Sequence, residues 1–116
     1  MAGKGGGSHR LTVRLKGRVE RERFETLDEA LAALETRGRE LQRTTRVTPV
    51  DTKVLGRYEP AQQVAARLEL SGRGGIDVRG DGSASAYTGR MRRRTVQEGA
   101  RESPYEALRR VLLSGG

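Results

Sequence analysis

Positively charged side chains gather in two stretches of the sequence, and their types and spacing could do chemistry. Residues 90–94 read RMRRR, which is four arginines around one methionine. Residues 14–23 carry five basic side chains, at positions 14, 16, 18, 21 and 23. Guanidinium groups donate paired hydrogen bonds to phosphate and to guanine, so such clusters are typical of surfaces that meet an anion. The candidate contact residues are Arg14, Lys16, Arg18, Arg21, Arg23, Arg90, Arg92, Arg93 and Arg94.

The same arginines have a second interpretation, in which they protect an edge strand. Charged side chains on an edge strand keep it from pairing with other chains. A few charges are enough for that purpose, whereas both stretches carry more. We therefore favour a surface that faces an anion, and edge protection stays the alternative.

The other chemically active residue types offer little for catalysis. The single histidine, His9, lies in a Gly-rich segment and the chain has no cysteine, which excludes a His/Cys metal site and leaves a serine nucleophile without a base. Glu69, Asp77 and Asp81 could hold a divalent metal, as in nucleases. Cross-strand ion pairs of Glu69 and Asp77 with arginines, and a turn at Asp81, explain these carboxylates better. We expect a non-enzymatic protein without a metal or a cofactor.

The overall charge favours an anionic partner. The net charge is +8, and 20 of the 23 basic residues are arginine. Residues 1–25 and 90–116 each carry seven basic and three acidic side chains, so the excess lies in these two segments. Such a balance favours nucleic acid first, and an acidic protein or membrane surface second. No apolar run approaches the roughly 20 residues of a membrane span, and the start lacks a signal peptide, so we expect a cytoplasmic protein of bacterial type without a membrane partner.

Alternation of apolar and polar residues predicts an antiparallel sheet. Leu11, Val13 and Leu15 share one strand face, whereas the next strand is charged on both faces and is typical of a sheet edge. An Asp-Gly pair at 81–82 predicts a hairpin turn. The segments GRGG and GDGS are turns rather than phosphate-binding loops. The predicted strands cover residues 11–16, 18–24, 64–70, 76–79 and a long returning strand at 84–96 that carries RMRRR.

Two capping signals predict two amphipathic helices. Thr26 and Glu29 have the spacing of a capping box before a helix over 27–42. Ser103, Pro104 and Glu106 start a second helix that runs to about 113. Between the first helix and the next strand, residues 44–61 show no sustained period and form a linker, which could hide a short strand at 52–55.

These elements predict an α+β fold, with an antiparallel sheet of about five strands and two amphipathic helices packed on one face. Residues 1–10 form a flexible Gly-rich tail, and residues 11–116 form a single domain. The helix starts TLDEALAAL and SPYEALRRV match at several positions, which suggests an internal β-β-α duplication of units 11–43 and 62–113. The predicted core comprises Val13, Leu15, Leu31, Leu34, Leu68, Leu70, Ile76, Val78, Leu108 and Val111.

The stretch LTVRLKGRVERERFETLDEALAALE resembles the sheet-plus-helix plan of the arm-binding domain of tyrosine recombinases and of the ethylene-response-factor type of DNA-binding domain. Basic strands end in Phe24, and a helix capped by Thr26 then carries a Glu-Ala pair. The stretch GIDVRGDGSASAYTGRMRRR, followed by SPYEALRRVL, is similar in plan. The resemblance implies a three-stranded sheet laid into the DNA major groove with the helix behind it. The order of helix, three strands and helix over 27–113 is also similar to double-stranded RNA-binding domains.

The sequence therefore supports two functional hypotheses. The first is a small, basic nucleic-acid-binding module that contacts duplex DNA, or RNA, through its arginine-rich strands. The alternative is a protein-interaction or assembly module, either an adaptor whose basic strands dock an acidic partner or a homodimer paired edge to edge. In that alternative Tyr58, Tyr87 and the segment 44–61 matter more than the arginines.

Overall fold

The structure, a computed structural model, describes residues 8–47, 63–89 and 92–114 of the chain. Residues 1–7 of the tail expected at 1–10, the short strand expected at 52–55, Tyr58 and Arg90 lie outside the described residues. The elements are β1 (His9–Leu15), β2 (Arg18–Phe24), α1 (Leu27–Val47), β3 (Val64–Leu70), β4 (Gly74–Arg79), β5 (Ala84–Thr88), β6 (Arg94–Thr95) and α3 (Pro104–Ser114).

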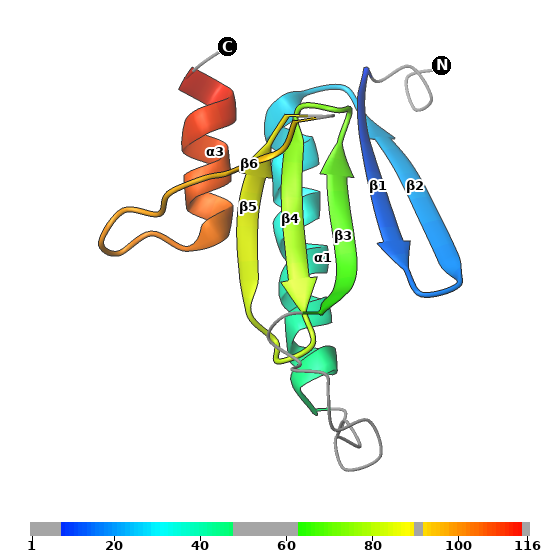
Figure 1. Ribbon diagram of the computed structural model, residues 1–116. Coiled ribbons are helices and arrows are strands. Elements are labelled where there is room, and N and C mark those ends of the chain that lie inside the picture. The colour runs from blue at the N-terminus through cyan, green and yellow to red at the C-terminus, as the bar shows by residue number, and fades with distance from the viewer. Residues whose placement is uncertain (1–7, 48–62, 90–91, 115–116) are drawn as a thin grey trace.

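The strands form one antiparallel sheet in the order β2-β1-β3-β4-β5-β6, with α1 and α3 against one face (Figure 1). The β1–β2 hairpin precedes α1, and the chain returns after the helix so that β3 pairs with β1. β2 is therefore an edge strand, as its charge pattern predicted. The α+β class, the antiparallel sheet and the two helices are confirmed. Neither helix of the described part is long and apolar enough to cross a membrane.

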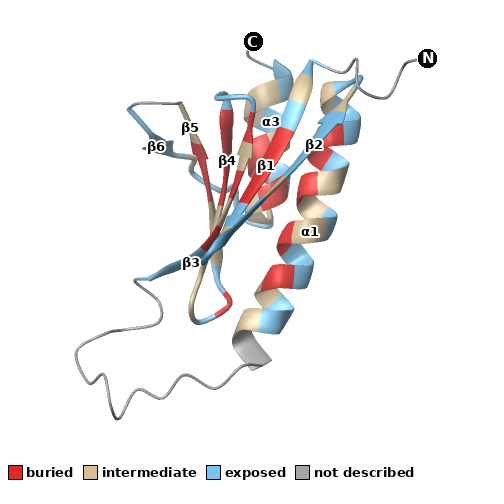
Figure 2. Cartoon of the chain, turned by 90° about the vertical axis from the view of Figure 1, so that its right-hand side faces the viewer, coloured by how far each residue is buried: buried red, intermediate tan, exposed pale blue. Residues whose placement is uncertain are grey.

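The core fills the space between the sheet and the helices. Alternate residues of the inner strands point toward the helices, and the buried residues of α1 lie on its sheet-facing side (Figure 2). Leu15 and Val111, which were expected in the core, are only partly buried, because each lies near the end of its element where cover is incomplete. The largest fully buried side chains are Leu34, Leu68, Leu70, Ile76, Val78 and Leu108.

Both helices begin where their capping residues predicted. The backbone N–H of Glu29 donates to Thr26 Oγ1 at 3.1 Å. Ser103 and Glu106 form a reciprocal capping box, with bonds of 2.8 and 3.1 Å between each backbone N–H and the other side chain.

The expected end of α1 at residue 42 is wrong, because the helix continues to Val47. Leu41 is buried, and the Gln42 amide donates to the carbonyl of Gly82 at 2.8 Å. These tertiary contacts hold the final turns, although the β-branched residues that follow favour a helix only weakly.

The long strand expected at 84–96 is also wrong. β5 ends at Thr88, and Gly89 has a φ of +94°, a left-handed conformation that favours glycine. The chain then reverses, so that Thr95 of β6 pairs with Tyr87. The sheet thus has six strands rather than five, and Arg92 and Arg93 precede β6 instead of lying within a strand. Two strands precede α1 and four lie between α1 and α3, so the internal duplication stays a prediction.

Candidate nucleic-acid interface

Within the described part of the chain, one face of the sheet carries no helix, and we call it the open face. Residues directly opposite one another on paired strands point to the same side of a sheet. The side chains that alternate with the core therefore lie on the open face, and Arg93, which precedes β6, joins them through its contacts there. The charged and aromatic members of this face are Arg10, Arg14, Arg21, Arg23, Arg67, Glu69, Asp77, Arg79, Tyr87 and Arg93.

The hairpin separates charge between the two faces of the sheet. Arg21 and Arg23 of β2 lie opposite Thr12 and Arg10 of β1, on the open face. The glutamates of β2, at positions 20 and 22, lie opposite the buried residues Val13 and Leu11, on the helix side. The strand that reads as charged on both faces is therefore basic on the open face and mainly acidic on the other.

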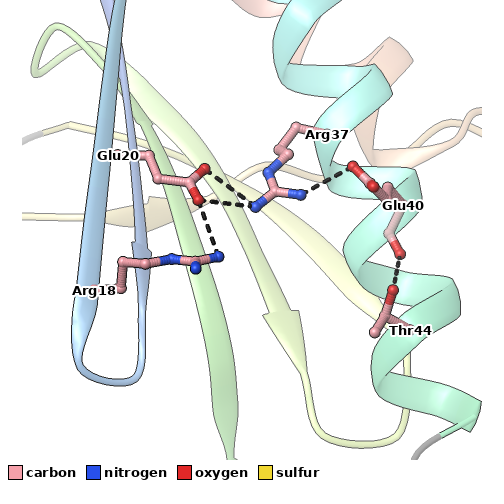
Figure 3. Close-up of polar contacts among 5 residues, drawn as sticks. All are labelled: Arg18, Glu20, Arg37, Glu40 and Thr44. Carbon is pink, nitrogen blue, oxygen red and sulfur yellow. Dashed lines mark hydrogen bonds and ion pairs between the residues drawn. The ribbon is translucent and has the colours of Figure 1, made fainter.

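Ion pairs tie the acidic side of β2 to α1 (Figure 3). Arg37 of α1 donates to both carboxylate oxygens of Glu20, at 3.1 and 3.2 Å, and to Glu40 at 2.9 Å. Arg18 also pairs with Glu20, at 3.1 Å. The hydrogen bonds to Glu40 and Glu20 raise the pKa of Arg37 above its usual value. This network holds the hairpin against the helix and so fixes where the open-face arginines point.

Two carboxylates on the open face neutralise part of its charge. Glu69 accepts from Arg14 Nε at 3.2 Å. Asp77 accepts from Arg67 Nε at 2.8 Å and from Arg93 Nη2 at 3.3 Å. The expected cross-strand pairing of Glu69 and Asp77 is confirmed. Seven arginines nevertheless share this described surface with only two carboxylates, so a net positive charge remains.

Tyr87 lies on the open face, opposite Gly75 and next to Arg93. A Cβ atom on Gly75 would lie 1.9 Å from the carbonyl oxygen of Leu68 and 2.7 Å from Tyr87 Oη, so only glycine fits at this position. The Arg93 guanidinium lies 3.9 Å from the centroid of the Tyr87 ring. Burial raises the pKa of Tyr87 to about 12. Its hydroxyl forms no hydrogen bond within the described part of the chain.

A hollow of about 430 Å³, which we call the basic depression, lies at one end of the open face. This is the end where β1 begins and where β2, β3 and β5 finish, at the top of Figure 1. Four arginines and a single carboxylate line it, together with Tyr87 and small residues from the strand ends. The charged residues of the lining are Arg10, Arg14, Arg23, Arg93 and Glu69.

The structure brings part of the predicted contact set together. The predicted residues that lie on the open face are Arg14, Arg21, Arg23 and Arg93. Lys16 lies beyond the end of β1, next to Gly17 of the hairpin turn, and Arg92 is exposed before β6. Arg90 lies outside the described residues.

Two predicted contact residues point the other way. Arg18 lies opposite Leu15, on the helix side, and pairs with Glu20. Arg94 lies opposite Thr88, which also faces the helix side. Their parity along the strand, rather than their charge, decides this placement.

The predicted contact set leaves out three arginines of the open face, Arg10, Arg67 and Arg79. Arg10 was assigned to the tail, but β1 begins at His9. The signal was present, because Arg10 continues the period-two series of Thr12 and Arg14. The sequence suggests only ion pairs for Arg67 and Arg79, on the solvent side of their strands, although the register sets Arg67 directly beside Arg14.

No cluster of metal-binding side chains is present among the residues that the structure describes. Comparisons with known proteins found no matching family model, no matching curated protein and no matching solved structure.

Proposed function

We propose that this chain is a non-enzymatic nucleic-acid-binding module, which contacts the phosphate backbone of duplex DNA with its open face. One observation carries the proposal. Strand alternation collects Arg10, Arg14, Arg21 and Arg23 on the open face, which no described helix covers, and it turns Glu20 and Glu22 toward the helix side. Such one-sided positive charge is the electrostatic footprint of nucleic-acid binding.

The position of the arginines favours binding over edge protection. Protective charges are needed on the edge strand, where backbone groups lack partners. Arg10 and Arg14 lie on β1, and Arg67 lies on β3, and both strands are paired on both sides. Arginines on interior strands protect no edge, so their presence on the open face requires another reason.

The open-face arginines retain donors for a phosphate. A guanidinium has five N–H donors, and Arg14 directs only its Nε toward Glu69. Arg10 and Arg21 form no ion pair with any described residue. The contact surface that we propose thus differs from the sequence prediction, since it includes Arg10 and omits Arg18 and Arg94.

The experiment is fluorescence anisotropy of a labelled DNA duplex, measured across a salt series. A variant with Arg10→Gln and Arg21→Gln is compared with a control carrying Arg18→Gln and Arg94→Gln, which loses the same charge from the helix side. We expect steeply salt-dependent binding by the natural sequence. The plot of log affinity against log salt should flatten by about 0.9 for each phosphate contact that is lost.

The two variants separate a specific surface from general charge. If the open face binds the duplex, the first variant loses affinity and the control keeps most of it. Equal losses in both variants would show that net charge alone attracts the DNA, and absence of binding at low salt would refute the proposal. A duplex RNA of the same sequence, run in parallel, tests the preference for DNA.

A further inference from the structure

The basic depression is a concave, positively charged hollow, which the side of a DNA duplex would not fill. Its volume of about 430 Å³ falls within the roughly 300–1,000 Å³ of small-ligand pockets. A duplex is too wide to enter a hollow of this size. Only a small group that projects from the nucleic acid can enter it. The lining is polar and strongly basic, so that group must be an anion.

Two arginines face each other directly at this site. Arg10 and Arg23 are cross-strand partners on the open face, and both line the basic depression. Like charges directly opposite one another destabilise a sheet. An anion placed between two guanidinium groups converts this repulsion into two attractive contacts. The arrangement therefore favours the state in which the depression holds a negatively charged group.

The neighbouring side chains complete an oriented set of donors. Arg14 lines the same depression, and its position is set through Nε by Glu69, while its two terminal nitrogens form no bond with a described residue. Arg93 forms one wall and is fixed by Asp77 and by the ring of Tyr87. Donors that are held in place before binding lose little freedom when the anion arrives.

From these contacts we infer that the basic depression is a subsite for the terminal phosphate of a nucleic-acid strand. A terminal phosphomonoester carries a charge of about −1.5 to −2 at neutral pH and presents three acceptor oxygens. An internal phosphodiester carries only about −1 and is flanked by sugar on both sides. The lining has three more arginines than carboxylates, so it offers positive charge and N–H donors to a group that carries up to two negative charges and three acceptor oxygens. This inference rests on the proposed function and adds preference for a strand end.

The test compares three DNA duplexes of one sequence by fluorescence anisotropy at fixed salt. The first has hydroxyl groups at all strand ends, the second has 5′-phosphates and the third has 3′-phosphates, and each carries its label at an internal base. We expect one or both phosphorylated duplexes to bind about tenfold more tightly than the first, a ratio that corresponds to about 1.4 kcal/mol.

Two single substitutions locate the effect. Arg10→Gln removes a depression arginine that has no ion pair to a described residue, so we expect the preference for the phosphorylated ends to disappear. Arg21→Gln is the matched control, because Arg21 lies on the same face without lining the depression. It should lower the affinity for all three duplexes by one common factor and leave the preference unchanged.

The outcomes separate this inference from the proposed function. Equal affinity for the three duplexes overturns the terminal-phosphate subsite and leaves the open face as a duplex-binding surface. A preference that survives Arg10→Gln also overturns the subsite. Absence of binding to every duplex overturns both the subsite and the nucleic-acid-binding function.

Discussion

At the scale of single residues, Tyr87 links the packing of the open face to its charge. Its hydroxyl end lies close to Gly75 and its ring contacts Arg93, while only 7% of the residue is exposed to solvent. The ring therefore contributes apolar burial and holds a guanidinium in place. The hydroxyl contributes neither to the apolar burial nor to the contact with Arg93, and it is buried without a hydrogen-bond partner among the described residues.

We expect Tyr87→Phe to leave the free energy of unfolding unchanged or to raise it. Burying a hydroxyl without a partner costs about 1–3 kcal/mol, and the substitution removes that cost while keeping the ring. Tyr105→Phe is the control, since the Tyr105 hydroxyl donates to Gln42 Oε1 at 2.5 Å. The control should lose about 0.5–1.5 kcal/mol. Urea unfolding measures both, and a clear loss in Tyr87→Phe would contradict the described environment of its hydroxyl.

The buried tyrosines also predict a dependence of stability on alkaline pH. Burial raises the pKa of both Tyr87 and Tyr105 to about 12, from the usual value of 10.0. A raised pKa means that folding favours the neutral phenol. The resulting stabilisation is complete below pH 10.0, where the unfolded chain is also neutral, and it is lost as the pH rises through about 12.

Titration by tyrosinate absorbance, in native and in denatured protein, measures this effect. In the native protein we expect Tyr87 and Tyr105 to ionise near pH 12, and in urea both should ionise near pH 10.0. Replacing both residues with Phe should remove the late ionisation. Native titration of these two residues at the ordinary value would show that their rings are not buried.

At the scale of elements, the contact between α1 and α3 explains an otherwise unfavourable glycine. Gly38 lies in the interior of α1, where glycine weakens a helix by about 1 kcal/mol relative to alanine. A Cβ atom at this position would lie 2.5 Å from Tyr105 Oη and 2.7 Å from the ring. The glycine therefore allows the tyrosine of α3 to pack directly on the backbone of α1.

We expect Gly38→Ala to destabilise the protein, although alanine is the better helix former. The added methyl group pushes Tyr105 away and breaks its bond with Gln42, and overpacking of this kind costs about 1–3 kcal/mol. In the background of Tyr105→Ala, the same change should instead raise the free energy of unfolding. Urea unfolding of the four proteins gives the coupling between the two sites, and additive effects would contradict the contact.

Local sequence signals predicted the beginnings of elements better than their ends. Thr26 and Ser103 fixed both helix starts, because a capping bond depends only on residues within one turn. The end of α1 and the break after β5 depend on distant partners. Gln42 reaches Gly82 across 40 positions, and the reversal after Thr88 is stabilised when Thr95 pairs back onto Tyr87. A short window of sequence contains neither partner.

At the scale of the whole molecule, the sequence predicted the positive charge of the strands but not which charged side chains lie on the open face and which on the helix side. Alternation placed Arg14 opposite the apolar face of its strand and placed Arg21 and Arg23 together on one side of theirs, yet it could not say which side of the edge strand the helices would cover. The register settles this, because Glu22 lies opposite the buried Leu11. The basic depression was beyond prediction, since its lining comes from five strands, β1 to β5, and from the turn between β3 and β4.

The edge strand β2 bears on the alternative function as a homodimer. Suppose that two copies pair antiparallel through β2 with their helices on the same side of the joined sheet. If Arg21 then lies opposite Arg21, Glu20 lies opposite Glu22. The two neighbouring registers that keep the helices on the same side place either Glu20 opposite Glu20 of the second copy or Glu22 opposite Glu22 of the second copy. Like charges directly opposite one another are destabilising, so these registers disfavour a dimer through this edge.

We therefore expect the chain to be monomeric in sedimentation velocity experiments, at low salt above all, where charge repulsion is least screened. Replacing Arg21 and Glu22 with Thr removes the repulsion without changing the net charge, and it should produce concentration-dependent association. The matched control replaces Arg101 and Glu98 with Thr, an exposed pair without ion-pair partners among the described residues. A stable dimer of the natural sequence that the edge substitutions abolish would reverse the argument, because the charges of β2 would then select its own edge as a partner and favour the assembly module over nucleic-acid binding.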